Sequence, residues 1–347
     1  MKKTIAILLT LVMCIGLFTA CGSKPAQPTP EPAAAEPAAE EPAEEEPAAE
    51  EPAEETASTD GPVKIGVSLQ GMTPFCISLK AALEENVQRY NDEGTPVEIT
   101  ILDGENDAAK QVGHCENFVQ QGMDVILLNG ISYDGCAPGV DAAVDAGIPV
   151  ITIIGEVANQ DKCVSFCGSR HYDSGVMLME NAIKDNGDSF KCVILEGVLG
   201  IDAQIQRMKG FEDVLANYPN IEVVEVQSAN WERPDAMKLV ENWLQSGKEF
   251  DVIISQNDNM ALGAIEALKA AGKTEIPVYG VDGDSDALQA IKNGEYAGTA
   301  FMSAMAMATH AVDYSVALAQ GRPEEVEKEP TIPFEWVNAD NIDEYLK

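Results

Sequence analysis

Short apolar runs that alternate with longer amphipathic segments constrain the fold of this chain more than any other feature of its sequence. The runs are rich in Val and Ile, and the segments between them carry apolar residues at helical spacing. Strands that are apolar on both faces are typical of parallel sheets covered by helices. The predicted strands are 63–69, 97–102, 124–129, 149–154, 164–166, 191–195, 222–227, 251–255 and 277–281, and the predicted helices are 78–90, 107–121, 138–146, 174–186, 204–218, 235–246 and 260–271.

The alternation of strands and helices runs once as far as residue 169 and then restarts. A body that extends from residue 62 to residue 347 also exceeds what one hydrophobic core usually holds. We therefore expect an α/β protein with two doubly wound parallel-sheet lobes and a cleft between them.

The run SQNDNMALG at 255–263 follows one predicted strand and opens the next helix. In an open α/β sheet, ligands bind at the carboxyl ends of the strands, where such turns meet the amino ends of helices. Asn257 and Asp258 occupy that place. Asn and Asp are also the usual helix caps, so a purely structural role for one of them is an open alternative.

The amino terminus has the pattern of an export signal. Lys2 and Lys3 precede an apolar run at 5–18 that is short for a membrane span, and small residues then precede Cys21. We predict a signal peptide at 1–20 and a lipidated Cys21, although Phe18 stands where a bacterial lipobox usually has Leu. Simple secretion without lipidation is the alternative.

Residues 21–61 are predicted to form a disordered tether. The segment consists almost wholly of Pro, Ala, Glu and Thr, so it has no large apolar side chain to bury. A Pro-rich spacer of this length reaches on the order of 100 Å. The formal net charge of −36 makes nucleic acid an unsuitable partner, and no second long apolar run follows Phe18. We expect a soluble body that is lipid-anchored to the outer face of the cell membrane.

Six of the eight cysteines lie in the body of the chain. Cys163 and Cys167 fall in a predicted strand, where four residues span about 13 Å, too far for a disulfide. No Cys or His spacing fits a zinc site, and GVLGID near Gly197 lacks the ending of a phosphate loop, so we predict no metal and no cofactor. We expect free, mostly buried thiols, with long-range disulfides as the alternative in an exported protein. The six are Cys76, Cys115, Cys136, Cys163, Cys167 and Cys192.

Seven short motifs follow one another along the body. They are PFCISLK near Pro74, LDGENDAAKQ near Asp103, GIPVIT near Ile148, QRMKGF near Arg207, NWERPDAM near Trp231, QNDNMALGAIEALKAAG from Gln256 and PVYGVDGDSDALQAIKNGEYAGTA from Pro277. In order and spacing these motifs resemble the type I periplasmic binding proteins of the ribose type, which are the sugar-binding components of ABC importers. The resemblance spans residues 63–337.

This resemblance implies two lobes joined by a hinge of three chain crossings. It places the first lobe at 62–169 and 303–331, and the second lobe at 170–302 and 332–347. It also implies that a monomeric protein captures a sugar or sugar-like polyol by hinge closure and delivers it to an ABC permease and its ATPase. The alternative is a sensor of the same fold, which binds a quorum-sensing furanose or an inositol-like ligand and signals to a chemoreceptor or a sensor kinase.

The resemblance further implies which residues bind the ligand. Asn257 falls on an Asn that hydrogen-bonds sugar hydroxyls, and Asp282 falls on a carboxylate that accepts from two of them. Arg207 matches a guanidinium that donates to ring or hydroxyl oxygens, while Phe75 and Trp231 match aromatic residues that stack on the sugar ring. Planar polar groups suit the hydroxyls at the rim of a sugar, and aromatic planes suit its C–H faces.

The chain departs from the family pattern in the first lobe. Ile154 and Gly155 stand where the family has an Asp-Arg pair, and Thr73, Cys76 and Met302 replace a family Asn, Phe and Gln. Hydroxyls left unpaired against Ile154 cost about 1 to 3 kcal/mol each, so we predict a ligand other than ribose in its usual pose. Five polar residues could supply new contacts, although a role as a solvated loop or hinge residue is favoured for each. They are Glu156, Tyr133, Asp134, Arg170 and His171.

Three other interpretations have less support. His114, His171 and His310 accompany no nucleophile motif, which disfavours an enzyme, and His114 is expected on the flank of its helix. The segment FMSAMAMATH at 301–310 is rich in thioethers, which suit soft copper, but Met at helical spacing usually fills a core. A transcriptional regulator of this fold needs a helix-turn-helix where this chain has its predicted signal peptide.

Overall fold

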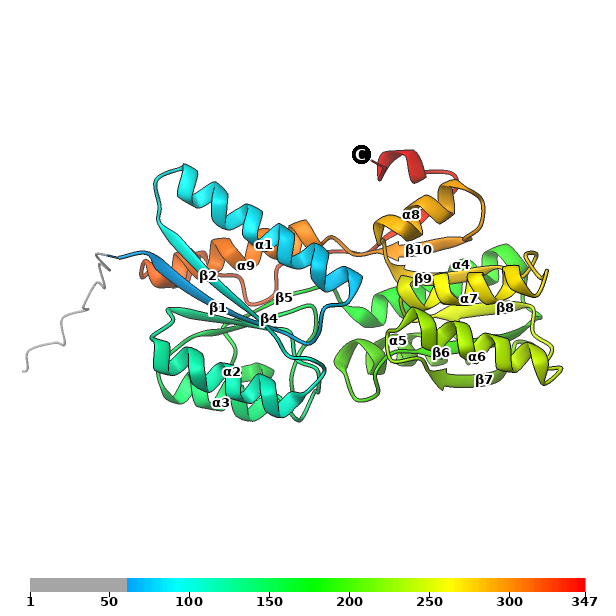
Figure 1. The fold of residues 1–347 in the computed structure, drawn as a ribbon, viewed down its shortest axis with the longest axis horizontal. Helices are drawn as coiled ribbons and strands as arrows, with labels where there is room; N and C mark the ends of the chain where they lie inside the picture. The colour runs from blue at the N-terminus through cyan, green and yellow to red at the C-terminus, as the bar shows by residue number, and fades with distance from the viewer. Residues whose placement is uncertain (1–60, 347) are drawn as a thin grey trace, which may run out of the picture. The chain divides into compact units, whose positions relative to one another are not determined.

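The computed structural model describes residues 61–346 (Figure 1). The predicted signal peptide, Cys21 and all but the last residue of the predicted tether lie outside the described residues. None of the helices between residues 61 and 346 combines the length and the apolar composition that a bilayer-spanning helix needs.

The first sheet has five parallel strands in the order β2-β1-β3-β4-β5. In the central strand β1, Ile65 lies opposite Ile99 of β2 on one side and Val125 of β3 on the other. Every residue of β3 and β4 is buried, as expected for strands covered on both faces. The strands are β1 Val63–Leu69, β2 Val97–Asp103, β3 Val125–Leu128, β4 Val150–Ile153 and β5 Ser165–Cys167.

Helices cover both faces of this sheet (Figure 1). On one face α1 packs against α9, and on the other α2 packs against α3. The first of these helices begins where Thr73 caps it, because Thr73 Oγ1 accepts a hydrogen bond from the Cys76 amide at 3.2 Å and Pro74 has the backbone angle of a first helical turn. The helices are α1 Pro74–Asp92, α2 Ala108–Gln121, α3 Ala137–Asp145 and α9 Ala304–Ala319.

The second sheet has six strands in the order β11-β10-β9-β8-β6-β7, of which β11 pairs antiparallel with β10. Successive residues of β6 serve opposite faces: Ile194 packs in the core beneath α4 and α5, and Leu195 in the core beneath α6 and α7. The elements are β6 Lys191–Glu196, β7 Glu222–Ser228, β8 Val252–Ser255, β9 Val278–Asp282, β10 Gly298–Phe301, β11 Glu335–Asn338, α4 His171–Asn186, α5 Asp202–Leu215, α6 Arg233–Gln245, α7 Asp258–Ala270 and α8 Ser285–Lys292.

The described chain passes between the two sheets three times. It leaves the first sheet after β5, at 168–170, and returns after β10, at 302–303, so that α9 covers the first sheet. It leaves again at 326–334 to form β11. We call the β1–β5 sheet with its four helices the first lobe, and the β6–β11 sheet with α4–α8 the second lobe. The predicted α/β class, with two doubly wound lobes and three crossings, is confirmed.

The six cysteines of the described body are all free and buried, which confirms the prediction of unpaired thiols. Burial raises the pKa of five of these thiols to about 12, because an apolar environment disfavours the thiolate. They therefore pack as small apolar side chains rather than as reactive groups.

The position of His114 was predicted wrongly. Its side chain is buried rather than on a flank of α2, and Nδ1 lies 3.0 Å from Ser68 Oγ of β1. The buried face of α2 carries Gln111 and His114 together with Cys115 and Phe118. A polar side chain can face a core when it has a partner there, and the partner is invisible in the apolar pattern of the helix alone.

Candidate functional site

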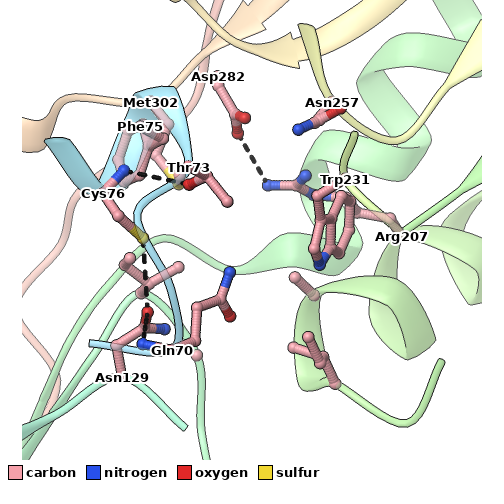
Figure 2. A pocket seen from close by; sticks show the side chains of 14 residues that line it. Gln70, Thr73, Phe75, Cys76, Asn129, Arg207, Trp231, Asn257, Asp282 and Met302 are labelled. Atoms are coloured by element: carbon pink, nitrogen blue, oxygen red, sulfur yellow. Dashed lines mark hydrogen bonds and ion pairs between the residues drawn. The ribbon is translucent and has the colours of Figure 1, made fainter. Parts of the chain in front are cut away.

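One cavity lies where the carboxyl ends of strands from both lobes face each other (Figure 2). About 440 Å³ of space lies between its walls, with the open mouth included. The eight residues predicted to bind ligand all line this cavity. The full lining is Gln70, Thr73, Phe75, Cys76, Asn129, Ile154 and Gly155 on the side of the first lobe, Ile201, Ala203, Arg207, Trp231, Asn257 and Asp282 on the side of the second lobe, and Met302 of a crossing.

Asn257 both caps a helix and lines the cavity. Its backbone is extended, with φ −151°, and its Oδ1 accepts a hydrogen bond from the Met260 amide of α7 at 2.9 Å. Because the carbonyl oxygen is used in the cap, the amide nitrogen Nδ2 is free to donate to a ligand. The two roles left open by the sequence are therefore compatible: the cap is confirmed, and the ligand contact stays a prediction.

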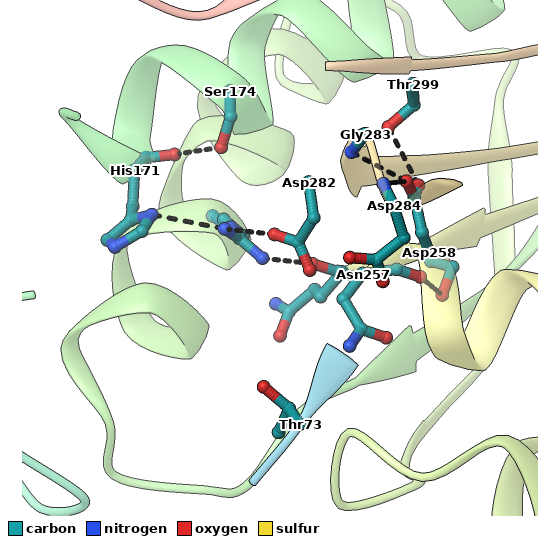
Figure 3. Close-up of polar contacts among 12 residues, drawn as sticks. Thr73, His171, Ser174, Asn257, Asp258, Asp282, Gly283, Asp284 and Thr299 are labelled. Atoms are coloured by element: carbon teal, nitrogen blue, oxygen red, sulfur yellow. Dashed lines mark hydrogen bonds and ion pairs between the residues drawn. The ribbon is translucent and has the colours of Figure 1, made fainter. Parts of the chain in front are cut away.

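Asp258 holds the loop that carries Asp282 (Figure 3). Its fully buried carboxylate accepts from the amides of Gly283 and Asp284 at 2.7 and 3.0 Å, and also from two hydroxyl groups. These contacts clamp a loop in which Asp282 has φ 124°, a backbone conformation that non-glycine residues rarely adopt. The hydroxyl donors are Tyr296 at 2.7 Å and Thr299 at 2.8 Å.

Arg207 and Asp282 form a buried ion pair at the cavity wall. Arg207 NH2 lies 3.4 Å from Asp282 Oδ1, NH1 donates to the Gln256 carbonyl, and Nε has no partner among the described residues. Burial raises the pKa of Asp282 to about 7; Arg207 opposes the rise and the charge of Asp258 adds to it. The Asp282 carboxylate thus accepts fewer hydrogen bonds from the protein than it can form, and its remaining lone pairs can accept hydrogen bonds from ligand hydroxyls.

The ring of His171 contacts the guanidinium of Arg207. Nδ1 of His171 lies 3.3 Å from Arg207 NH2, and the side chain is 2% exposed. Burial and the adjacent guanidinium lower the pKa of His171 well below its ordinary value, so the ring is neutral. With Arg207 as the donor, Nδ1 accepts and the ring proton belongs on Nε2.

Phe75 and Trp231 supply apolar walls from different lobes, Phe75 from α1 and Trp231 from the turn before α6. Trp231 has φ 65°, and a Cβ at Gly197 would lie 2.0 Å from its ring. Only glycine fits at that position. The Arg207 guanidinium lies 5.8 Å from the centre of the Trp231 ring, so the ring also borders the charged part of the cavity.

The first lobe presents uncharged groups to the cavity. Ile154 is the centre of a tight turn in which the Gly155 amide donates to the Ile153 carbonyl at 2.9 Å, and it has φ 68°. This conformation is rare for a β-branched side chain, and the turn occupies the place expected of the charged family pair. The Cys76 thiol donates to Asn129 Oδ1 at 3.7 Å, and Thr73 keeps its hydroxyl proton for another acceptor.

Sequence reasoning missed two polar lining residues, Gln70 and Asn129. Gln70 follows the last residue of β1, and Asn129 follows the last residue of β3. Both positions could have been found with the rule already applied to Asn257, since polar residues directly after parallel strands face the ligand edge of the sheet.

The five residues considered as replacement contacts lie elsewhere. Glu156, Arg170 and His171 line a separate polar cavity beside the first crossing, and Tyr133 and Asp134 line neither cavity. Two of the five join the lobes through their backbones: the Tyr133 amide donates to the Gly200 carbonyl at 3.0 Å, and the Glu156 amide donates to Asp202 Oδ2 at 3.2 Å. Tyr133 and Glu156 therefore make contacts between the lobes and do not line the cavity that holds the predicted ligand-binding residues.

The methionines of the 301–310 segment do not converge. Met302 lines the cavity, Met307 is buried in the core under α9, and Met305 is 43% exposed. Within residues 61–346, no group of three or more His, Cys, Asp or Glu side chains is placed to hold a metal ion.

Two doubly wound lobes, three crossings and a cavity that polar and apolar side chains of both lobes line define a bilobal solute-binding protein. A family model described as a periplasmic binding protein domain matches residues 65–323, and the chain belongs to that family. The family is extracytoplasmic and consists of substrate-binding proteins rather than enzymes, which excludes the enzyme interpretation.

Relatives and solved structures agree with this assignment. The chain is 31% identical over 292 residues to a xylitol-binding protein of Mycolicibacterium smegmatis, covering 83% of this chain and 80% of the relative. It is 31% identical over 300 residues to a ribose import binding protein of Bacillus subtilis, covering 86% and 87%. An ABC transporter solute-binding protein from Bacillus halodurans, solved with bound myo-inositol, has a TM-score of 0.78 and 33% identity, and the match covers 83% of this chain and 99% of that one.

Proposed function

We propose that this protein is the solute-binding component of an ABC importer and captures a sugar or sugar-like polyol in the cavity between its lobes. The observation that carries the proposal is the convergence of Arg207, Asp282 and Asn257 on a cavity that Phe75 and Trp231 also line. Donors and acceptors of this kind suit hydroxyl groups, and aromatic planes suit the C–H faces of a ring. The names of the relatives, which include xylitol, ribose and myo-inositol, support the same ligand class.

A polyol fits the first-lobe wall better than ribose in the pose typical of the family. The turn at Ile154 and Gly155 offers an apolar side chain where that pose needs charged partners, and Met302 offers a thioether. A hydroxyl that faces Ile154 loses its hydrogen bonds to water, at a cost of about 1 to 3 kcal/mol. The ligand therefore places few hydroxyls against Ile154.

Binding is coupled to closure of the hinge. The ligand binds one lobe first and then contacts the other, and contacts made only in the closed state shift the population toward that state. The moving bodies are 62–169 with 303–331, and 170–302 with 332–347. The closed monomer docks on a permease and its ATPase. Lipidation of Cys21 and the tether at 21–61 hold it on the outer face of the membrane at a high local concentration.

The proposal is tested by identifying the native ligand. Protein purified without denaturation is extracted and the released ligand is identified by mass spectrometry. The purified body is then titrated calorimetrically with ribose, xylitol and myo-inositol, and small-angle scattering with ligand should show compaction. Failure to bind any sugar or polyol refutes the proposal, and tight ribose binding refutes its first-lobe part. A sensor of the same fold would bind equally well, but deletion of its gene would leave ligand uptake intact.

A further inference from the structure

Gln70 is a largely buried residue whose side-chain amide has no hydrogen-bond partner among the described residues and stays accessible from the cavity. The residue is 8% exposed, and within residues 61–346 its side chain makes no hydrogen bond. Its backbone, in contrast, is held at both ends: the amide donates to Asn129 Oδ1 at 3.2 Å, and the carbonyl accepts from the Asn106 amide at 2.8 Å. The fixed backbone directs the side chain toward the cavity, where Figure 2 shows its amide group between Asn129 and Trp231.

Asn129 adds a second donor beside Gln70. Asn129 Oδ1 accepts hydrogen bonds from the backbone amide of Gln70 and from the Cys76 thiol. These two donors identify that atom as the oxygen, so Nδ2 is the side-chain atom that is free to donate. The Asn129 backbone is fixed in turn by Gln111, whose Nε2 donates to the Asn129 carbonyl at 2.8 Å and whose Oε1 accepts from the Ile131 amide at 2.8 Å. A buried network thus fixes the Asn129 side chain and the backbone of Gln70.

The chemistry of this wall selects for uncharged hydroxyl groups. A primary amide both donates and accepts, as a hydroxyl does, so the two groups can satisfy each other fully. The lining side chains of the first lobe carry no charge, and those of Gln70 and Asn129 offer two amide groups beside the apolar Phe75 and Ile154. A phosphate or carboxylate on this side of a ligand would be buried without a counter-charge, which is strongly unfavourable.

We propose that Gln70 is a specificity-determining residue, whose side-chain amide, next to Nδ2 of Asn129, hydrogen-bonds a ring hydroxyl of an uncharged polyol and replaces the charged first-lobe pair. This inference rests on the proposed function, because it identifies a side chain that contacts the sugar or polyol of that function. A site built to hydrogen-bond a hydroxyl discriminates strongly against an analogue that lacks it, since the protein's buried polar group is then left unpaired.

The test combines a substitution with changes in the ligand. Gln70→Met keeps the length of the side chain and removes its hydrogen bonds, and Gln88→Met on the exposed face of α1 is the matched control. Wild type and both variants are titrated calorimetrically with myo-inositol and with each of its monodeoxy analogues. We expect Gln70→Met to weaken myo-inositol binding by about 5- to 100-fold, and Gln88→Met to have no effect. For one deoxy analogue Gln70→Met should cause no loss of affinity relative to wild type, because that analogue lacks the hydroxyl that Gln70 binds.

The outcomes separate this inference from the proposed function. The inference is overturned if Gln70→Met binds myo-inositol within twofold of wild type. It is also overturned if the substitution weakens the binding of every deoxy analogue by the same factor. Either result leaves the proposed function unaffected. If wild type binds neither myo-inositol nor any other sugar or polyol, both fail. A thermal unfolding midpoint of ligand-free Gln70→Met equal to that of wild type excludes misfolding. If that variant does not fold, Gln70→Leu is titrated with the same ligands and judged by the same criteria.

Discussion

The substitution Asp282→Asn tests the centre of the proposed site. One carboxylate oxygen lies 3.4 Å from Arg207, which leaves the other oxygen and the remaining lone pairs for ligand hydroxyls. Hydrogen bonds to charged groups contribute about 1.5 to 3 kcal/mol each. The substituted side chain is also uncharged, so the buried Arg207 guanidinium loses the negative charge that it pairs with. Loss of one charged hydrogen bond together with a poorer Arg207 pair should reduce binding by about 2 to 4 kcal/mol, or roughly 30- to 1000-fold.

The assay is calorimetric titration with the sugar or polyol that wild type binds most tightly. The matched control is Asp286→Asn, which makes the same chemical change on a side chain that is 75% exposed. Thermal unfolding of the ligand-free proteins shows whether the fold is retained. A change in affinity of less than threefold in a folded Asp282→Asn variant, or an equal change in the control, would refute the placement of this carboxylate against the ligand.

Three further predictions follow from the geometry around the cavity. Because the pKa of Asp282 is raised to about 7, its charge is lost as the pH falls through 7; calorimetry should show weaker binding from pH 8 to pH 5, and stronger binding at low pH would contradict this. In Gly197→Ala the new Cβ displaces the Trp231 ring, so binding should weaken at least tenfold (about 1.4 kcal/mol), whereas Gly113→Ala, with nothing within 4 Å, should bind normally. In Asp258→Ala four donors lose their buried acceptor, and urea unfolding should show a loss of about 3 to 5 kcal/mol; a loss below 1 kcal/mol would show that the loop does not depend on this carboxylate.

The polar groups of the second lobe were the most predictable part of the site. Asn257 lies two residues after the end of strand β8, Asp282 ends strand β9, and Arg207 lies just over one turn into helix α5, so local pattern and motif order together place them near the ligand edge. The prediction also left open whether Asn257 was a cap or a site residue. The structure shows that one amide can serve as a cap through its oxygen and face the cavity with its nitrogen.

The first-lobe wall was predicted less well. Ile154 and Gly155 were correctly placed at the cavity, but the side chains expected to replace the missing charges were sought among nearby polar loops. Gln70 and Asn129, which do line the cavity, come from the ends of two strands that are adjacent in the sheet and 59 residues apart in the chain. His171, in contrast, contacts the guanidinium of Arg207.

The sequence by itself determined the alternation of strands and helices, the two-lobed class and the family to which the chain belongs. These properties depend on periodicity and motif order, and both are local patterns that survive without knowledge of sheet order. Only the tertiary structure decided which polar groups face the ligand from the first lobe and which ones support them. That outcome depends on strand neighbours and on rare backbone angles at Ile154, Trp231 and Asp282, which packing across the whole domain stabilises and no local pattern encodes.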